Sequence, residues 1–368
     1  MKKRVLATML ILAMTFSLAG CSGGSKDSAS GSKDSDKKTE SKAEDAPEST
    51  KIRWNCGNSG DVLLTIAKQK GYLEDEGIEV ETVRSTNADA MTMLSTGQVD
   101  VVSNSGTSNP LQQIASGVDF TVFGGHMVTG CMPIIAKKGT EWKGVESLVG
   151  KKFACNPSYF AFSGALMDKG YNDPLNQVEW LTYSSYDDAL AAVVRGEADY
   201  ALMGTGQNYN VKNMDDIEIV AYQSDVMPNY SCCRLVCQTD YLKKNPNTLK
   251  HLMKAMIRAQ EFYESNLDEA VSMQAKEIDA DEDYVAAYML DKEHYVVSID
   301  PLKNSVERAW DILDKIGFLD EKAKDINIDD HINTELYEQA LTETTEKYGK
   351  DDPDFYDKMK TFYDENNK

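Results

Sequence analysis

One pattern of residue types occurs twice in this chain, around Gly97 and again around Gly196. In both places a helical run ends at the glycine, and a polar and a small apolar residue follow it. An aspartate, Asp100 or Asp199, then precedes an apolar strand. Strand and helix signals alternate around each copy, which favours right-handed crossovers and a mainly parallel sheet. The sequence therefore predicts two similar α/β units.

Hydrophobic periodicity locates the elements of these units. In the first unit we expect strands over 52–56, 78–83 and 99–102, and helices over 62–70, 89–95 and 111–115. In the second we expect strands over 152–155, 178–181 and 198–202, and helices over 160–167 and 186–194. Beyond Thr239 we expect helices over 249–263, 267–276, 281–292, 302–316 and 335–346. The apolar face of 249–263 predicts packing on the first unit.

The N-terminus has the features of an export signal. Lys2-Lys3-Arg4 is followed by the apolar stretch 5–18, which is short for a membrane span, and small residues precede Cys21. This segment resembles the lipobox of bacterial lipoproteins, in which the cysteine is diacylated. An ordinary secretory signal with a chance cysteine is the alternative. We expect Cys21 to be the lipidation site and the protein to be exported and anchored to the outer face of the cytoplasmic membrane.

The stretch after Cys21 lacks aromatic and large aliphatic residues up to Thr50, so it predicts a disordered tether. The formal net charge of the whole chain is −21. This acidity argues against a nucleic-acid partner and against a polybasic attachment to anionic lipid.

Six further cysteines are scattered along the chain, without a Cys-x-x-Cys motif or a nearby histidine pair. They are Cys56, Cys131, Cys155, Cys232, Cys233 and Cys237. The spacing argues against a zinc site, and we expect neither a metal nor a cofactor. The sequence leaves open whether these cysteines form disulfides or remain buried thiols.

Three stretches carry a family resemblance: residues 72–80, the two Gly-x-x-Asp elements and residues 148–153. Together they resemble the solute-binding proteins of bacterial ABC importers, in the nitrate, sulfonate, taurine and thiamine-precursor (SsuA/THI5-like) group. The resemblance implies an α/β, two-lobed fold of the periplasmic-binding-protein type II. It also implies C-terminal helices packed on lobe 1, a ligand in the cleft and closure on binding.

The resemblance also divides the chain. The N-terminal residues predict a lipoprotein signal peptide over 1–20 and a tether over 21–50. For the rest of the chain, the resemblance implies the first part of lobe 1 over 51–130, lobe 2 over 131–234, and the return crossing with the C-terminal helical part of lobe 1 over 235–368. The two crossings between lobes are expected near 126–137 and 229–239.

Four polar loops follow predicted strands, and none of them contains Lys or Arg: 55–61, 103–109, 156–160 and 203–207. Ligands of open parallel sheets bind at such strand ends, where free amides hold an anion or a neutral polar molecule. The alternative is that these residues only cap helices. The candidate ligand-binding residues are Asn58, Ser59, Ser105, Gly106, Thr107, Ser158, Tyr159, Thr205 and Gln207.

The predicted return crossing adds one candidate cation. Strand alternation places Cys233 and Arg234 on opposite faces, so one of them can face the cleft. An inward Arg234 would bind a carboxylate or sulfonate through bidentate hydrogen bonds. His126, near the first crossing, is a further candidate, with a structural role as the alternative.

Enzymatic motifs are missing from the sequence. It has no Gly-x-Ser-x-Gly elbow, and only four histidines are present to serve a triad. The predicted function is therefore that of a monomeric, lipid-anchored binding protein, not an enzyme, which delivers a small polar organic molecule or oxyanion to an ABC permease and ATPase. A THI5-type pyrimidine synthase and a solute sensor for a membrane partner are the alternatives.

Overall fold

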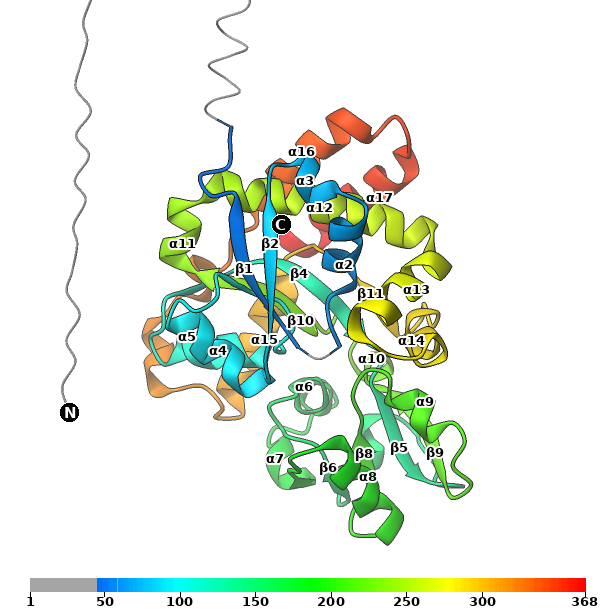
Figure 1. Ribbon diagram of the computed structural model, residues 1–368. Coiled ribbons are helices and arrows are strands. Elements are labelled where there is room, and N and C mark those ends of the chain that lie inside the picture. Colours follow the sequence, from blue (N-terminus) through cyan, green and yellow to red (C-terminus); the bar gives the residue numbers. More distant parts are fainter. Residues whose placement is uncertain (1–44, 58) are drawn as a thin grey trace, which may run out of the picture. The chain divides into compact units, whose positions relative to one another are not determined.

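Two β-sheets, one in each lobe, organise the folded part of the chain (Figure 1). The structure is a computed structural model that describes residues 45–57 and 59–368, and Ala46–Lys368 forms one compact unit. The predicted signal segment, Cys21 and most of the predicted tether lie outside the described residues. Among the residues described, no helix combines the length and the apolar character needed to cross a bilayer.

The sheet of lobe 1 has six strands in the order β11-β4-β10-β3-β1-β2. Its strands are β1 (Lys51–Cys56), β2 (Glu79–Arg84), β3 (Val101–Val102), β4 (Phe120–Gly130), β10 (Cys233–Gln238) and β11 (Tyr295–Val297). Strand β1 pairs in parallel with β2 and β3, whereas β10 and β11 run antiparallel to their neighbours.

The sheet of lobe 2 has five strands in the order β7-β6-β8-β5-β9. Its strands are β5 (Pro133–Lys137), β6 (Lys152–Ala154), β7 (Glu179–Leu181), β8 (Tyr200–Leu202) and β9 (Ile217–Tyr222). Strand β6 pairs in parallel with β7 and β8, and β5 is antiparallel to β8 and β9. Five strands of lobe 1, in the order β2-β1-β3-β10-β4, therefore have the same succession of parallel and antiparallel pairs as the five strands of lobe 2.

The repeated aspartate has the same role in both lobes. The backbone N–H of Arg53 donates to Oδ2 of Asp100 at 2.8 Å, and the N–H of Asp100 donates back to the Arg53 carbonyl at 2.8 Å. Lys152 and Asp199 make the same two bonds, at 2.9 and 2.8 Å. Each aspartate thus ties the start of its third strand to its first strand.

The expectation of mainly parallel sheets is wrong, because both sheets are mixed. Strand β4 leads directly into β5 in the other lobe, and the chain returns from β9 through β10. These strands enter each sheet against the direction of the β-α-β units, so antiparallel pairs form at β10 and β5.

Helices surround both sheets. In lobe 1 the first helices are α2 (Val62–Gln69), α3 (Tyr72–Asp75), α4 (Asn87–Ser95) and α5 (Ser108–Ala115). Lobe 2 has α6 (Ala161–Asp168), α7 (Pro174–Gln177), α8 (Tyr186–Arg195), α9 (Gln207–Val211) and α10 (Gln223–Val226). The later helices are α11 (Thr239–Lys244), α12 (Pro246–Ser265), α13 (Leu267–Ile278), α14 (Glu282–Met289), α15 (Lys303–Lys315), α16 (Glu335–Tyr348) and α17 (Pro353–Asn367). Short 3₁₀ turns span Val145–Leu148, Glu321–Asp325 and Ile328–His331.

The long helix α12 packs on lobe 1, as its apolar face predicts. Leu252, Met256 and Ala259 are fully buried on this face, and α12 contacts α2, α3 and α16 (Figure 1). Helix α17 packs on α15 and α16. The acidic C-terminal segment therefore completes the outer layer of lobe 1.

Strained backbone marks both crossings between the lobes. Cys131 lies between β4 and β5 with φ of 49°, and Asn229 and Ser231 precede β10 with φ of 53° and 56°. Residues other than glycine adopt this left-handed region at a cost, which surrounding contacts must offset. Contacts around both crossings must therefore offset this conformational cost.

Candidate functional site

A cavity of about 790 Å³ lies where loops of the two lobes meet. Loops of lobe 1 contribute Gly57, Ser59, Ser85, Thr86, Asn104, Ser105, Gly106, Ser108 and Asn109, and lobe 2 contributes Asn156, Ser158, Tyr159, Tyr186, Thr205 and Gln207. The crossings contribute Met127, Met132, Tyr230, Cys232 and Cys233, and the C-terminal helical region contributes Ile278, Ala280, Tyr284 and Tyr288.

The position of this cavity follows from the strand directions. Strands β1, β3, β6 and β8 all end at it, so their loops meet at the carboxyl edges of the two sheets. Side chains join these loops to one another: Nδ2 of Asn104 donates to Oγ of Ser59 at 2.7 Å and to the Gly60 carbonyl at 3.2 Å. The loop after β3 is therefore held against the loop after β1.

Most of the residues singled out in the sequence lie together at the cavity. Those that line it are Ser59, Ser105, Gly106, Ser158, Tyr159, Thr205 and Gln207. Asn58 lies outside the described residues. All four predicted loops thus contribute to one site, although they come from distant parts of the chain.

Thr107 does not line the cavity, contrary to its selection as a ligand-binding residue. Its buried hydroxyl donates to the carbonyl of Ser231, and its N–H donates to the carbonyl of Cys232 at 3.0 Å. Thr107 therefore holds the loop before α5 against the return crossing, and its side chain has no free donor for a ligand.

Arg234 is also absent from the cavity lining, so its predicted role as an anion partner is not supported. The side chain is buried beneath the sheet, where Nη1 donates to the Asp300 carbonyl at 2.7 Å and Nη2 to the Met127 carbonyl at 2.5 Å. Burial lowers the pKa of the guanidinium to about 10. Alternation along β10 does hold, with Cys233 as the residue that faces the cavity.

His126 forms a buried pair with Asp61 rather than lining the cavity. Nδ1 of His126 lies 3.1 Å from Oδ1 of Asp61, which also accepts the N–H of Leu64 at the start of α2. Burial opposes both charges, but the attraction and hydrogen bonding between the two groups outweigh it. The pKa of His126 is therefore raised and that of Asp61 lowered, which favours the ion pair.

The described lining of the cavity contains no Lys, Arg, His, Asp or Glu. Its polar groups are hydroxyls, amides, the thiols of Cys232 and Cys233, and five tyrosine phenols, at Tyr159, Tyr186, Tyr230, Tyr284 and Tyr288. The Tyr230 ring lies 4.5 Å, centroid to centroid, from that of Phe160, and burial raises the pKa of its phenol. The site therefore offers hydrogen-bonding groups and aromatic surface, without a cationic side chain.

Sequence reasoning did not select four of these tyrosines. Tyr284 and Tyr288 lie one helical turn apart on α14, and Oη of Tyr284 donates to the Thr205 carbonyl in the other lobe at 3.4 Å. Gly206 leaves room for this contact, since an added Cβ would lie 2.3 Å from Oη of Tyr284. The spacing of the two tyrosines was the available signal, but the same spacing occurs on buried helix faces.

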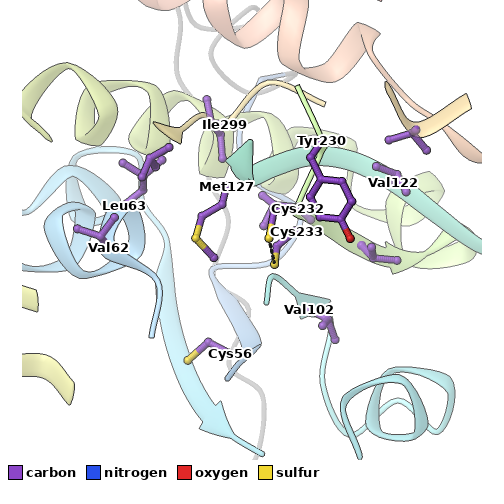
Figure 2. Packing of buried hydrophobic residues seen from close by; sticks show 14 of the residues in the cluster. Cys56, Val62, Leu63, Val102, Val122, Met127, Tyr230, Cys232, Cys233 and Ile299 are labelled. Atoms are coloured by element: carbon purple, nitrogen blue, oxygen red, sulfur yellow. Dashed lines mark hydrogen bonds between the residues drawn. The ribbon is translucent and has the colours of Figure 1, made fainter. Parts of the chain in front are cut away.

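Two cysteines lie in the wall of the cavity. The sulfur atoms of Cys232 and Cys233 are 3.8 Å apart, and Met127 and Tyr230 flank them (Figure 2). All six cysteines of the described chain are free thiols. In the same part of the chain, no group of three or more His, Cys, Asp or Glu side chains is arranged to hold a metal ion.

Two solved structures with the same fold are named as solute-binding proteins. The aliphatic sulphonate binding protein SsuA of Escherichia coli has a TM-score of 0.64 and 18% identity, covering 77% of this chain and 92% of its own. The nitrate-binding protein NrtA of Synechocystis PCC 6803 has a TM-score of 0.64 and 16% identity, covering 81% and 89%. These similarities show a shared periplasmic-binding-protein fold.

Sequence comparison points the same way. YtlA of Bacillus subtilis (strain 168), which is named as a candidate binding protein, is 24% identical over 297 residues, 76% of this chain and 86% of its own. Residues 61–270, more than half of the chain, match the NMT1/THI5-like family. Together with the two-lobed fold, this match establishes that the chain belongs to the NMT1/THI5-like family.

Proposed function

We propose that this protein captures a small polar organic molecule in the cavity between its lobes and delivers it to an ABC permease. The observation that carries the proposal is the convergence of loops from both lobes on one cavity of about 790 Å³. Ligand pockets of proteins usually measure roughly 300–1,000 Å³. A ligand held by both lobes favours the closed arrangement over the open one, and a permease can distinguish the two.

The lining favours an uncharged or weakly polar ligand with an aromatic part over a small inorganic oxyanion. The described lining has no Lys, Arg, His, Asp or Glu side chain, and five phenol rings provide surface for stacking. A second cavity of about 340 Å³ adjoins the first and shares Asn156, Tyr159 and Tyr186 with it. The pocket therefore suits a pyrimidine-like or larger aromatic solute, whereas an anion would rely on neutral amide and hydroxyl donors without a cation.

The N-terminal sequence supports a location outside the cytoplasm. The basic residues 2–4, the apolar stretch 5–18 and Cys21 have the order of a lipoprotein signal. We propose that an acylated Cys21 anchors the protein at the outer face of the membrane. There the binding lobes could meet both the external solute and the permease.

A thermal-shift screen tests the proposed function. The purified protein is melted with pyrimidines, flavins, aromatic carboxylates, sulfonates and nitrate at millimolar concentration. A ligand of the folded state alone stabilises it by about 2.7 kcal/mol at 100 times its dissociation constant. We expect an increase of several degrees with an aromatic, uncharged class. No shift with any compound, or a shift with nitrate alone, would contradict the proposal.

A matched pair of variants ties such a shift to the cavity. Tyr159→Ala removes a lining ring, whereas Tyr171→Ala removes a half-buried tyrosine of the same lobe outside the lining. We expect Tyr159→Ala alone to lose the ligand-induced shift. Equal shifts in both variants would place the ligand elsewhere.

A further inference from the structure

The return crossing brings two adjacent thiols to the cavity wall. Cys232 and Cys233 both line the cavity, with exposed fractions of 8% and 4%, and their sulfur atoms are 3.8 Å apart. Ser231, immediately before them, has a left-handed backbone conformation with φ of 56°. A molecule inside the cavity would therefore meet both sulfur atoms.

The surroundings of Cys233 favour its thiolate. The S–H of Cys232 is the largest stabilising influence on the Cys233 thiolate, and burial opposes it. The charges of His126 and Arg234 and the backbone N–H of Gly106 add to the stabilisation, so the pKa of Cys233 falls to about 7. As a thiol, Cys233 lies 3.3 Å from Oδ1 of Asn104. The hydrogen bond between the two cysteine side chains raises the pKa of Cys232.

The four other cysteines of the described chain lack this environment. Burial raises the pKa of Cys56 to about 11 and that of Cys131 to about 12, and it also raises the pKa of Cys155 and Cys237. Thiolates, not thiols, are the nucleophiles in exchange with disulfides. Cys233 therefore combines access from the cavity with nucleophilic character.

We propose that Cys233 and Cys232 form a reactive dithiol site in the cleft, which takes low-molecular-weight disulfides as its substrate class. The Cys233 thiolate attacks one sulfur of the small disulfide, whose S–S bond breaks and releases one thiolate, which takes up a proton. Cys232 then loses its proton to water and attacks Sγ of Cys233, and the second thiol leaves. The protein dithiol is oxidised to a Cys232–Cys233 disulfide, and the small disulfide is reduced to two thiols.

The product is expected to be reversible. Adjacent α-carbons are about 3.8 Å apart, which is shorter than the usual span of about 4.4–6.8 Å across a disulfide. A bridge between neighbours is therefore strained and more readily reduced than an ordinary structural disulfide. Excess thiol should return the site to its dithiol form.

Peptide mapping of the full chain tests this reaction. The reduced protein is treated with hydroxyethyl disulfide at neutral pH, quenched with acid and digested with trypsin. Residues 213–234 form one tryptic peptide, in which Cys232 and Cys233 are the only cysteines. We expect this peptide to lose the mass of two hydrogen atoms and to regain it with excess thiol. A peptide that stays reduced would overturn the proposal, as would a stable mixed disulfide in the unaltered protein.

Single substitutions separate the two roles. Cys232→Ser should trap the mixed disulfide on Cys233, about tenfold or more faster than Cys155 reacts. The serine hydroxyl can still donate to the Cys233 thiolate, which is about half ionised at neutral pH, whereas Cys155 stays protonated. Cys233→Ser should abolish the fast reaction, and the control Cys237→Ser should leave it unchanged. Equal rates at Cys233 and Cys155 in Cys232→Ser would overturn the proposal. If a serine variant fails to fold, the alanine variant of that cysteine is used.

Discussion

His126 and Asp61 form an ion pair in the interior of lobe 1, with 3.1 Å between Nδ1 and Oδ1 and almost no exposure of either side chain. His126 lies on β4, which leads into lobe 2, and Asp61 caps α2, which follows a loop of the cavity. The pair therefore connects the first crossing strand to the cavity loop after β1. Its charges also lie behind the cavity wall, close enough to affect Cys233.

Breaking this pair should destabilise the protein strongly. His126→Gln leaves the Asp61 carboxylate buried without its cation, which typically costs about 3–5 kcal/mol. Urea unfolding of the unaltered protein, both single variants and Asp61→Asn/His126→Gln measures the coupling in a double-mutant cycle. Additive single effects would contradict a direct interaction between the two side chains.

The contribution of the pair should depend on pH in a defined direction. The His126 part is fully present below the unfolded pKa of about 6.5 and is lost as pH rises through the raised folded pKa. The Asp61 part is present above the unfolded value of about 3.8 and is lost as pH falls through the lowered folded pKa. The stability difference from the double variant should thus be largest between these limits. A difference independent of pH would argue against the ion pair.

Arg234 should matter for stability and not for ligand binding. Arg234→Met leaves the Met127 and Asp300 carbonyls without their buried donor, at a cost of about 1–3 kcal/mol for each group. The control Arg195→Met removes an exposed pair with Glu197 and should change the free energy of unfolding by less than about 1 kcal/mol. Lost binding with unchanged stability in Arg234→Met would restore the anion-binding role.

The two repeated aspartates should differ in their importance. Asp100→Ala loses the hydrogen bond from the Arg53 backbone N–H and also the contact between Oδ1 and Nη2 of Arg53 at 2.5 Å. Asp199→Ala loses only the hydrogen bond from the Lys152 backbone N–H. We expect Asp199→Ala to cost about 1 kcal/mol and Asp100→Ala more. Chemical denaturation gives both values, and the reverse order would contradict this account of the repeat.

Gly125 should tolerate no side chain. A Cβ there would lie 2.4 Å from the carbonyl oxygens of both Ser298 and Asp300, which pass directly over β4. Gly125→Ala must therefore displace backbone, and we expect a loss of about 3 kcal/mol or failure to fold. Gly139→Ala is the control, since its Cβ meets open space and only the positive φ opposes it. Similar melting temperatures for the two variants would be inconsistent with the close approach.

The alkylation rate of Cys233 should follow its ionisation. The rate with iodoacetamide, read on the peptide 213–234, should rise with pH through a midpoint of about 7. The groups that act on this thiol are Cys232, the Gly106 N–H, Arg234 and His126, with Asp61 behind the imidazole. His126→Gln removes one cation and should raise the midpoint. An unshifted midpoint would show that His126 does not influence the thiol.

The features that could be predicted from the sequence are mostly local. The glycine after each helix and the aspartates at 100 and 199 act within their own β-α-β units. Short segments of sequence were therefore enough to predict the two α/β units and the cavity loops. The long-range pairing of β10 with β4 is different, because it decides that Cys233 rather than Arg234 faces the cavity. Alternation alone gives two opposite faces without saying which is inside.

The tyrosines of α14 illustrate the same limit. Tyr284 and Tyr288 lie on one face of the helix, and periodicity shows this correctly. Their place at the cavity depends on how α14 meets α9 of the other lobe, where Nδ2 of Asn208 donates to the Ala287 carbonyl at 2.6 Å. That contact joins segments far apart in the chain, and no local pattern specifies it.

Hydrogen exchange with and without a stabilising ligand from the thermal screen tests the central claim most directly. Binding between the lobes should slow amide exchange in peptides from both cavity walls, in 103–109 of lobe 1 and 156–160 of lobe 2, and leave α16 unchanged. Protection confined to one lobe, or located outside the cavity loops, would contradict a ligand site between them.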